Sequence, residues 1–367
     1  MKLTVVTKNL QQSLRMVEKT TGRQTHLPVL QGVLFETENG RLKLTTTNLE
    51  IASVYRIGAK IEEEGKIVVP TKIISELINQ IQIEKLNLIS KNDTLFIELP
   101  NYKTKINCLP HKDFPLIPSV ESKNTISVNS RLLKDGISRI LEAASNSESR
   151  PEISGIFMVS LEKKLTFAAT DSFRLAESRI LGIGGNLISC IIPKFTANEV
   201  VRLCSEVSEE INILVSENQI QFKSESGELI SKLIEGRYPD YQKIIPQNFV
   251  SINKYQTQNL IQTIKAVSIF TNNINEVTMK RTNRQTELFV KNSDKGEISI
   301  AIEQEGKGED FEMNLNCQYL LEGLKNINTQ HSVLYYVGER APLVLKPAEE
   351  EEGVYTYLVM PLKNKEG

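Results

Sequence analysis

The 367-residue sequence has no tryptophan, only three histidines and only four cysteines. The cysteines are far apart and form no C-x-x-C pair, so the sequence predicts neither a zinc site nor a disulfide framework. The histidines have no metal-ligand spacing and no nucleophile motif beside them. No stretch approaches the roughly 20 apolar residues of a membrane span, and the start is too polar for a signal peptide. We expect a cytoplasmic protein without a metal ion or cofactor.

Net charge is also nearly absent, because 44 basic residues face 45 acidic ones and leave a net charge of −1. That balance excludes the high net charge typical of disordered chains. It also lacks the basic excess typical of nucleic-acid-binding proteins. The composition, 40% hydrophobic and 24% charged, is ordinary for a globular protein. At about 100–200 residues per domain, the length predicts two or three domains.

An internal repeat organises the chain. Segment 28–57 matches segment 151–180 without a gap when the sequence is shifted by 123 residues. The matched pairs are Pro28 and Pro151, Gly32 and Gly155, Leu42 and Leu165, Thr47 and Thr170, and Ile57 and Ile180. A fainter third copy repeats the spacing of Leu133, Ile137 and Ile140 at Leu260, Ile264 and Val267. Such self-similarity predicts repeated domains, here with the ranges 1–120, 125–246 and 249–367.

Each repeat is expected to fold in the same way, as an α+β domain with two helices packed on one face of an antiparallel sheet. An opening strand is predicted at Lys2–Val6, Thr125–Val128 and Phe249–Ile252. An amphipathic helix follows, and a second helix comes after a strand that ends in proline. The predicted helices are 8–19, 71–81, 130–142, 194–207, 254–265 and 316–326.

The near-zero net charge conceals a separation of sign. The six predicted helices hold twelve basic and seven acidic residues, a net +5, which leaves −6 on the rest of the chain. Lysine and arginine on a repeated helical face suit sequence-independent contact with phosphates. An ordinary solvated helix face is the competing interpretation. The basic residues singled out are Lys8, Arg15, Lys72, Arg131, Lys134, Lys194 and Lys254.

Enzyme motifs are missing from the sequence. There is no G-x-x-x-x-G-K-[ST] phosphate loop, and Gly182–Gly185 lacks the third glycine of a dinucleotide fingerprint. Asp171 resembles a catalytic acid or base, but its repeat partner is Asn48, which favours a turn or capping role. We therefore expect a non-catalytic protein.

Three motifs resemble those of the bacterial beta sliding clamps, the processivity subunits of the replicative DNA polymerase III. They are Thr170–Leu175 (T-D-S-F-R-L), Gly236–Tyr241 (G-R-Y-P-D-Y) and Tyr357–Leu362 (Y-L-V-M-P-L). The resemblance covers nearly the whole chain. It implies the DNA clamp fold, with two chains joined head to tail into a closed ring of six domains whose helices face the central hole. The function implied is DNA replication, as a factor that encircles duplex DNA and tethers the polymerase.

The same resemblance implies site residues. For DNA contact it adds Arg23 and Arg150, and it also points to Lys194. For the contact between the two chains it implies Thr104, Ile106, Ser268 and Ile269. For a peptide-binding pocket it implies Ile153, Thr170, Arg174, Leu175, Pro239, Lys243, Ile244, Ile274, Asn316, Tyr319, Arg340, Pro342, Leu358, Met360, Pro361 and Leu362. Phe173 stands where many relatives have histidine, which predicts a different motif preference.

The partners expected are duplex DNA, a second copy of the chain, the polymerase III catalytic subunit, the clamp loader, and repair and translesion polymerases. A function of a different class is a three-repeat protein-interaction scaffold that does not bind DNA. Neutral or acidic helices would favour that scaffold, whereas the basic excess on the helices favours the clamp.

Overall fold

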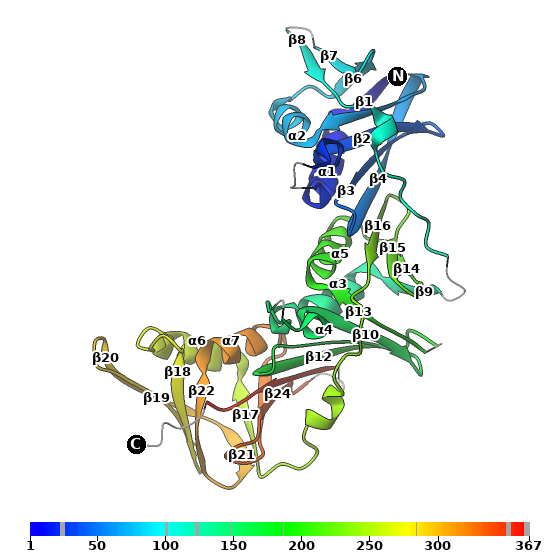
Figure 1. Cartoon of the computed structure of the whole chain (residues 1–367). Coiled ribbons are helices and arrows are strands. Elements are labelled where there is room, and N and C mark those ends of the chain that lie inside the picture. Colours follow the sequence, from blue (N-terminus) through cyan, green and yellow to red (C-terminus); the bar gives the residue numbers. More distant parts are fainter. Residues whose placement is uncertain are drawn as a thin grey trace. The chain divides into compact units, whose positions relative to one another are not determined.

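The computed structural model describes residues 1–22, 26–99, 102–121, 125–147, 149–185, 187–283, 285–349 and 354–362 (Figure 1). Its chain divides into two compact units. One unit comprises Met1–Lys134 and Asn198–Leu233, and the other comprises Asp135–Ala197 and Ile234–Gly367. The units therefore share the second repeat between them. The domain ranges predicted from the repeat remain a prediction.

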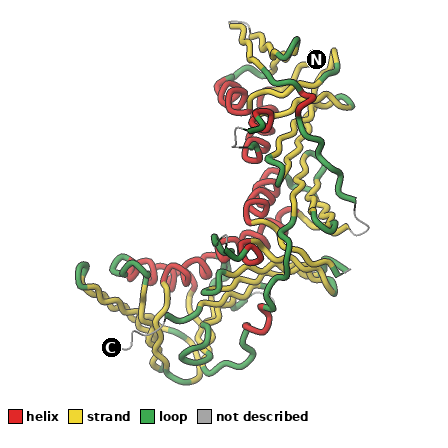
Figure 2. Tube along the Cα trace, in the orientation of Figure 1, coloured by secondary structure: helices red, strands yellow, loops and turns green. Residues whose placement is uncertain are grey.

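The first unit is built on an antiparallel sheet of twelve strands in the part of the chain that the structure describes (Figure 2). Its main path runs β8-β7-β6-β1-β4-β16-β15-β14-β9. Off this path, β3 pairs with β4, β2 pairs with β3, and β5 pairs with β2. The strands are β1 Lys2–Val6, β2 Gly32–Glu38, β3 Arg41–Thr47, β4 Ile51–Glu63, β5 Lys66–Pro70, β6 Lys85–Ser90, β7 Thr94–Leu99, β8 Tyr102–Asn107, β9 Thr125–Asn129, β14 Glu210–Val215, β15 Gln219–Lys223 and β16 Gly227–Lys232.

One strand pair joins the first two repeats into this sheet. Strand β4 pairs with β16 from Ile51 opposite Ser231 to Tyr55 opposite Gly227. The sequence predicts sheets within each repeat, and it gives no signal for this pairing between repeats. The consequence is one continuous ladder across the junction.

Helices α1 (Thr7–Val17) and α2 (Thr71–Gln80) pack against each other, α1 also against β4 and α2 against β2. The amphipathic helix predicted after the first strand is confirmed, since Leu10, Leu14 and Val17 of α1 are all buried. These three residues recur at the helical period and give α1 one apolar face.

The second unit contains a nine-stranded and a four-stranded antiparallel sheet among its described residues. The larger sheet runs β13-β10-β11-β12-β25-β24-β23-β17-β21, and the smaller runs β20-β19-β18-β22. The strands are β10 Gly155–Leu161, β11 Lys164–Thr170, β12 Arg174–Leu181, β13 Ile188–Pro193, β17 Ser251–Gln256, β18 Glu276–Thr282, β19 Gln285–Asn292, β20 Gly296–Glu303, β21 Glu305–Gly308, β22 Phe311–Asn316, β23 His331–Tyr336, β24 Leu343–Pro347 and β25 Tyr355–Val359.

Here too a strand pair joins two repeats, since β12 pairs with β25 from Arg174 opposite Val359 to Ser178 opposite Tyr355. Helices α6 (Thr257–Ser268) and α7 (Cys317–Lys325) pack together, and a short helix α4 spans Pro151–Ser154. Helices α3 (Ser130–Ser138) and α5 (Lys194–Glu206) each cross the division between the units. The α+β architecture predicted from the sequence is confirmed.

The opening strand of the third repeat was predicted wrongly. It is β17 at Ser251–Gln256 rather than Phe249–Ile252, so α6 begins only at Thr257. The alternation is hidden because polar residues occupy buried positions. Asn253 is fully buried, and its Oδ1 accepts a hydrogen bond from Nε of Arg281 at 3.0 Å. A buried polar residue with a partner looks like an exposed one in the sequence pattern.

The internal repeat extends to the hydrogen bonds of one turn. In the first repeat, Oγ1 of Thr47 donates to the carbonyl of Ile51 and accepts from the amide of Leu49. In the second repeat, Thr170 makes the same two bonds, to Arg174 and Ser172. The third residue of each turn is left-handed, with φ of 75° at Leu49 and 79° at Ser172.

The Asp171 carboxylate belongs to this turn. Its Oδ1 accepts hydrogen bonds from the amides of Phe173 and Arg174, at 2.9 and 3.0 Å. Oδ1 of Asn48 accepts the equivalent pair in the first repeat. The turn role expected for Asp171 is confirmed, and its Oδ1 is committed to the backbone of the turn.

Candidate functional site

The predicted basic residues lie mostly on exposed helix surface. Lys8 and Arg15 project from α1, Lys72 from α2 and Arg131 from α3, all exposed, and Lys134 on α3 is half-buried. With the observed bounds, helices α1, α2, α3, α5, α6 and α7 carry nine basic and five acidic residues, a net +4. The basic excess of the helices is retained.

Two predicted basic residues are placed differently from the expectation. Lys254 lies in strand β17 and not on a helix, and its Nζ lies 3.8 Å from a carboxylate oxygen of Glu349. Lys194 is the first residue of α5, and its Nζ donates to the carbonyl of Ala144 at 3.0 Å and to Oδ1 of Asn146 at 2.9 Å. Burial lowers the pKa of Lys194. Both ammonium groups therefore have protein partners.

The other basic residues differ in how many protein partners their side chains already have. Arg202 on α5 is bound to Glu199 and to the backbone carbonyls of Arg15 and Met16, so it contributes little free charge to the helix surface. Arg150 is exposed, and its Nη1 lies 3.3 Å from the hydroxyl of Ser172. Arg23 lies outside the described residues.

Three residues predicted for the peptide pocket belong to one hydrophobic core cluster. Ile153, Leu175 and Leu358 are 4%, 3% and 2% exposed and pack with Tyr238 and Tyr241. Thr170 and Pro342 are buried as well. These five predicted pocket residues are therefore buried beneath the surface, and their side chains are covered by other parts of the protein.

The tyrosines of the G-R-Y-P-D-Y motif explain why that motif has its composition. The Tyr238 ring stacks on Phe157 with the ring centroids 4.9 Å apart. The Tyr241 hydroxyl donates at 2.7 Å to the buried carboxylate of Glu177, which also pairs with Arg179 at 2.6 Å. Burial and the Glu177 charge raise the pKa of Tyr241. The motif anchors the segment that leads into the third repeat.

Arg174 is held by its own chain. Its Nε lies 3.0 Å from the Asp171 carboxylate, a second nitrogen pairs with Glu322 on α7, and the guanidinium lies 4.4 Å from the Tyr319 ring centroid. The side chain is only 10% exposed. Burial alone would lower the pKa of Arg174, but Tyr357 and Asp171 raise it. The guanidinium is thus engaged by carboxylates and an aromatic ring of its own chain.

The Asn316 side chain also has hydrogen-bond partners within its own chain. It caps α7, with its Oδ1 accepting from the amides of Gln318 and Tyr319 at 2.9 and 3.1 Å. Its Nδ2 donates to the carbonyl of Ile274 at 3.0 Å. A capping side chain satisfies helix amides that otherwise lack a partner. Both residues, implied as members of the peptide pocket, thus have partners within the chain, since Arg174 pairs with Glu322 on α7 and Asn316 caps that helix.

The remaining members of the predicted pocket are accessible. Ile244 and Ile274 are 50% and 49% exposed. Pro239, Lys243 and Arg340 are also exposed, with the Lys243 ammonium 2.7 Å from Asp240, and Tyr319, Met360, Pro361 and Leu362 are half-buried.

The end of the chain is fixed by two backbone bonds that sequence reasoning did not find. The amide of Met360 donates to the carbonyl of Phe173, and that of Leu362 donates to Asn314, both at 2.8 Å. Phe173 itself is 62% exposed beside this segment. Glu322, the partner of Arg174, was missed because it is far away in the sequence and no spacing rule links the two.

The predicted contact between chains involves an edge strand and the end of a helix. Thr104 and Ile106 lie on β8, an edge strand of the twelve-stranded sheet. Thr104 is half-buried, whereas Ile106 is 3% exposed and points into its own core. Ser268 ends α6, and Ile269 beside it is 68% exposed. Ile269 is thus the largest apolar surface offered by this set.

Comparison with known proteins decides which family this arrangement belongs to. Three successive family models match the chain: the DNA polymerase III beta subunit N-terminal domain over residues 1–118, the central domain over 127–240 and the C-terminal domain over 242–363. The chain belongs to the DNA polymerase III beta subunit family. The three matched domains follow one another in the order of the internal repeats.

Relatives of the whole length support this assignment to the beta subunit family. The beta sliding clamp of Synechococcus elongatus is 26% identical over 380 residues, covering 99% of both chains. That of Bacillus subtilis is 24% identical over 378 residues, covering 99% of this chain and all of the relative.

Solved beta subunits share the fold. The structure of the DNA polymerase III beta subunit from Thermotoga maritima has a TM-score of 0.92 at 24% identity over 99% of both chains. That from Pseudomonas aeruginosa has a TM-score of 0.94 at 23% identity, covering 99% of this chain and all of the other. Among the described residues of this beta subunit family member, no helix has both the length and the apolar character that crossing a membrane requires.

Proposed function

We propose that the chain acts as a DNA sliding clamp, a processivity factor that encircles duplex DNA and tethers the replicative polymerase. The observation that carries this conclusion is the run of three beta subunit domains over nearly the whole chain, at the full length of relatives named beta sliding clamps. The scaffold alternative is disfavoured by the same match. We further propose that the chain is a non-catalytic accessory subunit and works in the bacterial cytoplasm.

A ring requires that two chains meet head to tail, and two edge strands support this part of the proposal. Strand β8 ends the twelve-stranded sheet and strand β20 ends the four-stranded sheet. An edge strand presents unpaired N–H and C=O groups to another chain. β8 carries exposed Lys103 and Lys105, whereas β20 carries exposed Glu297 and Glu303. Opposite charges favour pairing of β8 with β20 of the partner chain over pairing of like edges.

The contact with DNA is proposed to be weak and mobile. Exposed Lys8, Arg15 and Arg131 supply point charges that contact phosphates without reading bases. A closed ring retains DNA by topology, so its contacts need no high affinity, and tight contacts would slow sliding. Lys72, Lys134 and Arg150 extend the same set, whereas Lys194 and Lys254 already have protein partners.

The peptide site is proposed at the surface above the buried core cluster. Exposed Ile244 and Ile274, with half-buried Met360, offer apolar area to a short motif on the polymerase, the clamp loader, or repair and translesion polymerases. Methionine is unbranched and adapts to different side chains, which suits a site with several partners.

Encirclement is tested by retention on circular and linear DNA. The chain is loaded with a clamp loader onto nicked circular duplex, and the retained fraction is measured before and after a restriction cut. We expect retention on circles and loss after linearisation. Reversal of Lys103 and Lys105 to Glu should abolish retention on circles, and the same reversal of exposed Lys112 should leave it intact. Equal retention on both DNA forms would contradict encirclement.

The peptide site is tested by one substitution at half-exposed apolar surface. Ile244→Lys replaces an apolar side chain by a charged one where a motif would pack. The binding free energy should lose up to the about 1.5–3 kcal/mol that burial of an isoleucine side chain contributes. We expect the affinity for a polymerase C-terminal peptide, measured by calorimetry, to fall at least tenfold. Leu161 is exposed to a similar extent, at 46%, so Leu161→Lys is the matched control. Equal affinity of the two variants would remove the peptide site from this surface.

A further inference from the structure

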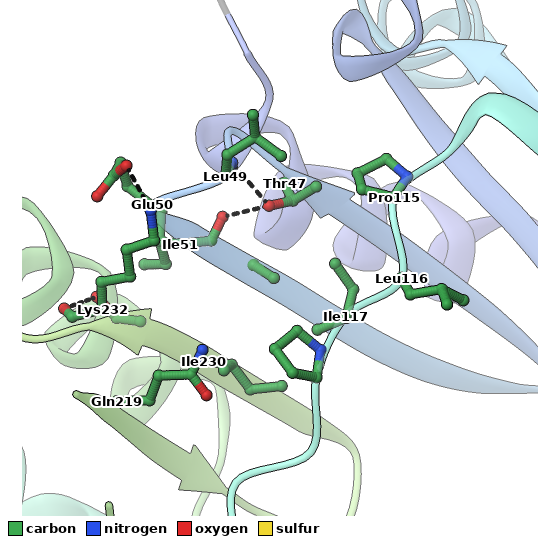
Figure 3. Close-up of a pocket in the computed structure, with 13 residues that line it drawn as sticks. Thr47, Leu49, Glu50, Ile51, Pro115, Leu116, Ile117, Gln219, Ile230 and Lys232 are labelled. Atoms are coloured by element: carbon green, nitrogen blue, oxygen red, sulfur yellow. Dashed lines mark hydrogen bonds and ion pairs between the residues drawn. The ribbon is translucent and has the colours of Figure 1, made fainter. Parts of the chain in front are cut away.

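A cavity of about 150 Å³ lies in the first unit, where the start of β4 meets the end of β16 (Figure 3). Buried Ile51 and Ile230 form its floor on the two paired strands. Leu49 lies at one end, and Ile117 faces the strands from the segment that follows β8. None of the residues predicted as sites lines this cavity.

The size and lining of the cavity determine what it can hold. An apolar cavity of about 150 Å³ takes a benzene-sized group, so it accommodates one leucine or phenylalanine side chain. The charged groups at the rim, Glu50 and Lys232, pair with each other at 3.0 Å. Because this pair neutralises itself, the rim gives no preference for a charged ligand, and the group that fits is uncharged and apolar.

Beside the cavity runs a short stretch of unpaired backbone. Leu116 and Ile117 lie between Pro115 and Pro118, and within the described part of the chain their N–H and C=O groups make no backbone hydrogen bond. Leu116 is 96% exposed and points away from the cavity in Figure 3. An extended peptide recognised by strand-like pairing needs such free backbone groups next to a side-chain pocket.

The internal repeat gives this cavity a counterpart. Ala52 pairs with Ile230, just as its repeat equivalent Leu175 pairs with Leu358 at the next junction. At the preceding position Ile51 stands where Arg174 stands in the second repeat. Arg174 forms ion pairs with Asp171 and Glu322 at its junction, whereas Ile51 is apolar and can form none. The first junction is therefore left with an apolar hollow.

We propose that this cavity binds a short extended segment of a partner protein through one leucine- or phenylalanine-sized side chain. This would be a second peptide site, beside the one already proposed around Ile244, Ile274 and Met360. The evidence for it does not depend on the first site, because the cavity, its rim and its free backbone groups involve different residues.

The test uses methyl NMR of the full chain with ¹³C-labelled isoleucine δ1 groups. The probe is a capped pentapeptide with phenylalanine at its centre, between alanine and glycine residues. We expect saturable shifts of the Ile51, Ile117 and Ile230 methyls and contacts between the phenyl ring and these methyls. A probe with aspartate at its centre should cause neither.

Two variants make the assignment specific. Leu49→Asn removes the apolar end of the cavity, and asparagine tolerates the left-handed backbone there, so the fold is kept. We expect this variant to weaken the probe about tenfold, while Leu161→Asn leaves it unchanged. Met360→Lys, at the first peptide site, should also leave it unchanged. The inference is overturned if the three methyls do not respond, if both leucine variants bind equally, or if Met360→Lys abolishes the shifts.

Discussion

At the scale of single residues, Arg174 shows how one guanidinium joins two repeats. It lies on β12 of the second repeat, yet its partners include Glu322 on α7 of the third. A buried arginine with carboxylate partners is expensive to leave incomplete, because removing one member leaves the others charged and unpaired. Asp171, fixed in its turn by two backbone amides, keeps the guanidinium in position.

We therefore expect Arg174→Gln to destabilise the second unit by about 3 kcal/mol. The measurement is urea denaturation of the full chain. Arg41→Gln is the control, because Arg41 is 47% exposed and lies 3.8 Å from Glu225, so its loss should cost less than about 1 kcal/mol. If Arg174 serves mainly to orient a bound peptide, Arg174→Gln will lose peptide affinity at unchanged stability.

At the scale of elements, the pairing of β4 with β16 depends on one close approach. Gly227 lies opposite Tyr55, and a Cβ added to this glycine would stand 2.5 Å from the tyrosine ring. Glycine is found where another group comes too near for a side chain. The ring of Tyr55 thus covers the first residue of β16.

Gly227→Ala should weaken this junction. The added methyl forces the Tyr55 ring to move, and overpacking of this kind costs about 1–3 kcal/mol. Gly58→Ala, also on β4, is the matched control, because nothing lies within 4 Å of a Cβ added there. Amide hydrogen exchange of β4 and β16 measures the outcome, with faster exchange expected only for Gly227→Ala. Equal hydrogen-exchange protection of β4 and β16 in both variants would show that the Tyr55 ring moves aside without destabilising the junction.

The sequence predicts elements better than it predicts their contacts. The bounds of β1 agree with the predicted strand Lys2–Val6 because its apolar and polar residues alternate. Strand β17 and the position of Lys254 were predicted wrongly because buried Asn253 has a partner, Arg281, that no local pattern reveals. The resemblance implies Arg174 as a pocket residue, but no local pattern reveals its carboxylate partner Glu322, which comes from a different repeat.

At the scale of the whole molecule, the basic excess is a property of the repeated helices together. Single basic residues on α1 or α3 are ordinary solvent-exposed side chains. Repetition places several of them on equivalent helices, which keeps the helices at +4 in a chain whose net charge is −1.

Replacing Lys8, Arg15, Arg131 and Lys134 together by Gln should weaken contact with duplex DNA. The slope of log K against log salt is negative, and each phosphate contact that is lost reduces its magnitude by about 0.9. The slope is measured by fluorescence anisotropy from 50 to 200 mM salt, a range in which such contacts weaken strongly. Exposed Lys60, Lys91, Lys112 and Lys223 provide a control variant of equal charge change. The same slope for both variants would refute the assignment of DNA contact to these helices.

The ladder from Ile51–Tyr55 to Gly227–Ser231 has a consequence for how the chain can be divided. The stretch of sequence that recurs is one repeat, but the compact unit takes in a repeat and part of its successor. A fragment cut in the connection near residues 118–126 would leave β4 with an open ladder, which is a template for aggregation. The sequence is modular, but a cut between the first two repeats would separate strands that are paired in one sheet.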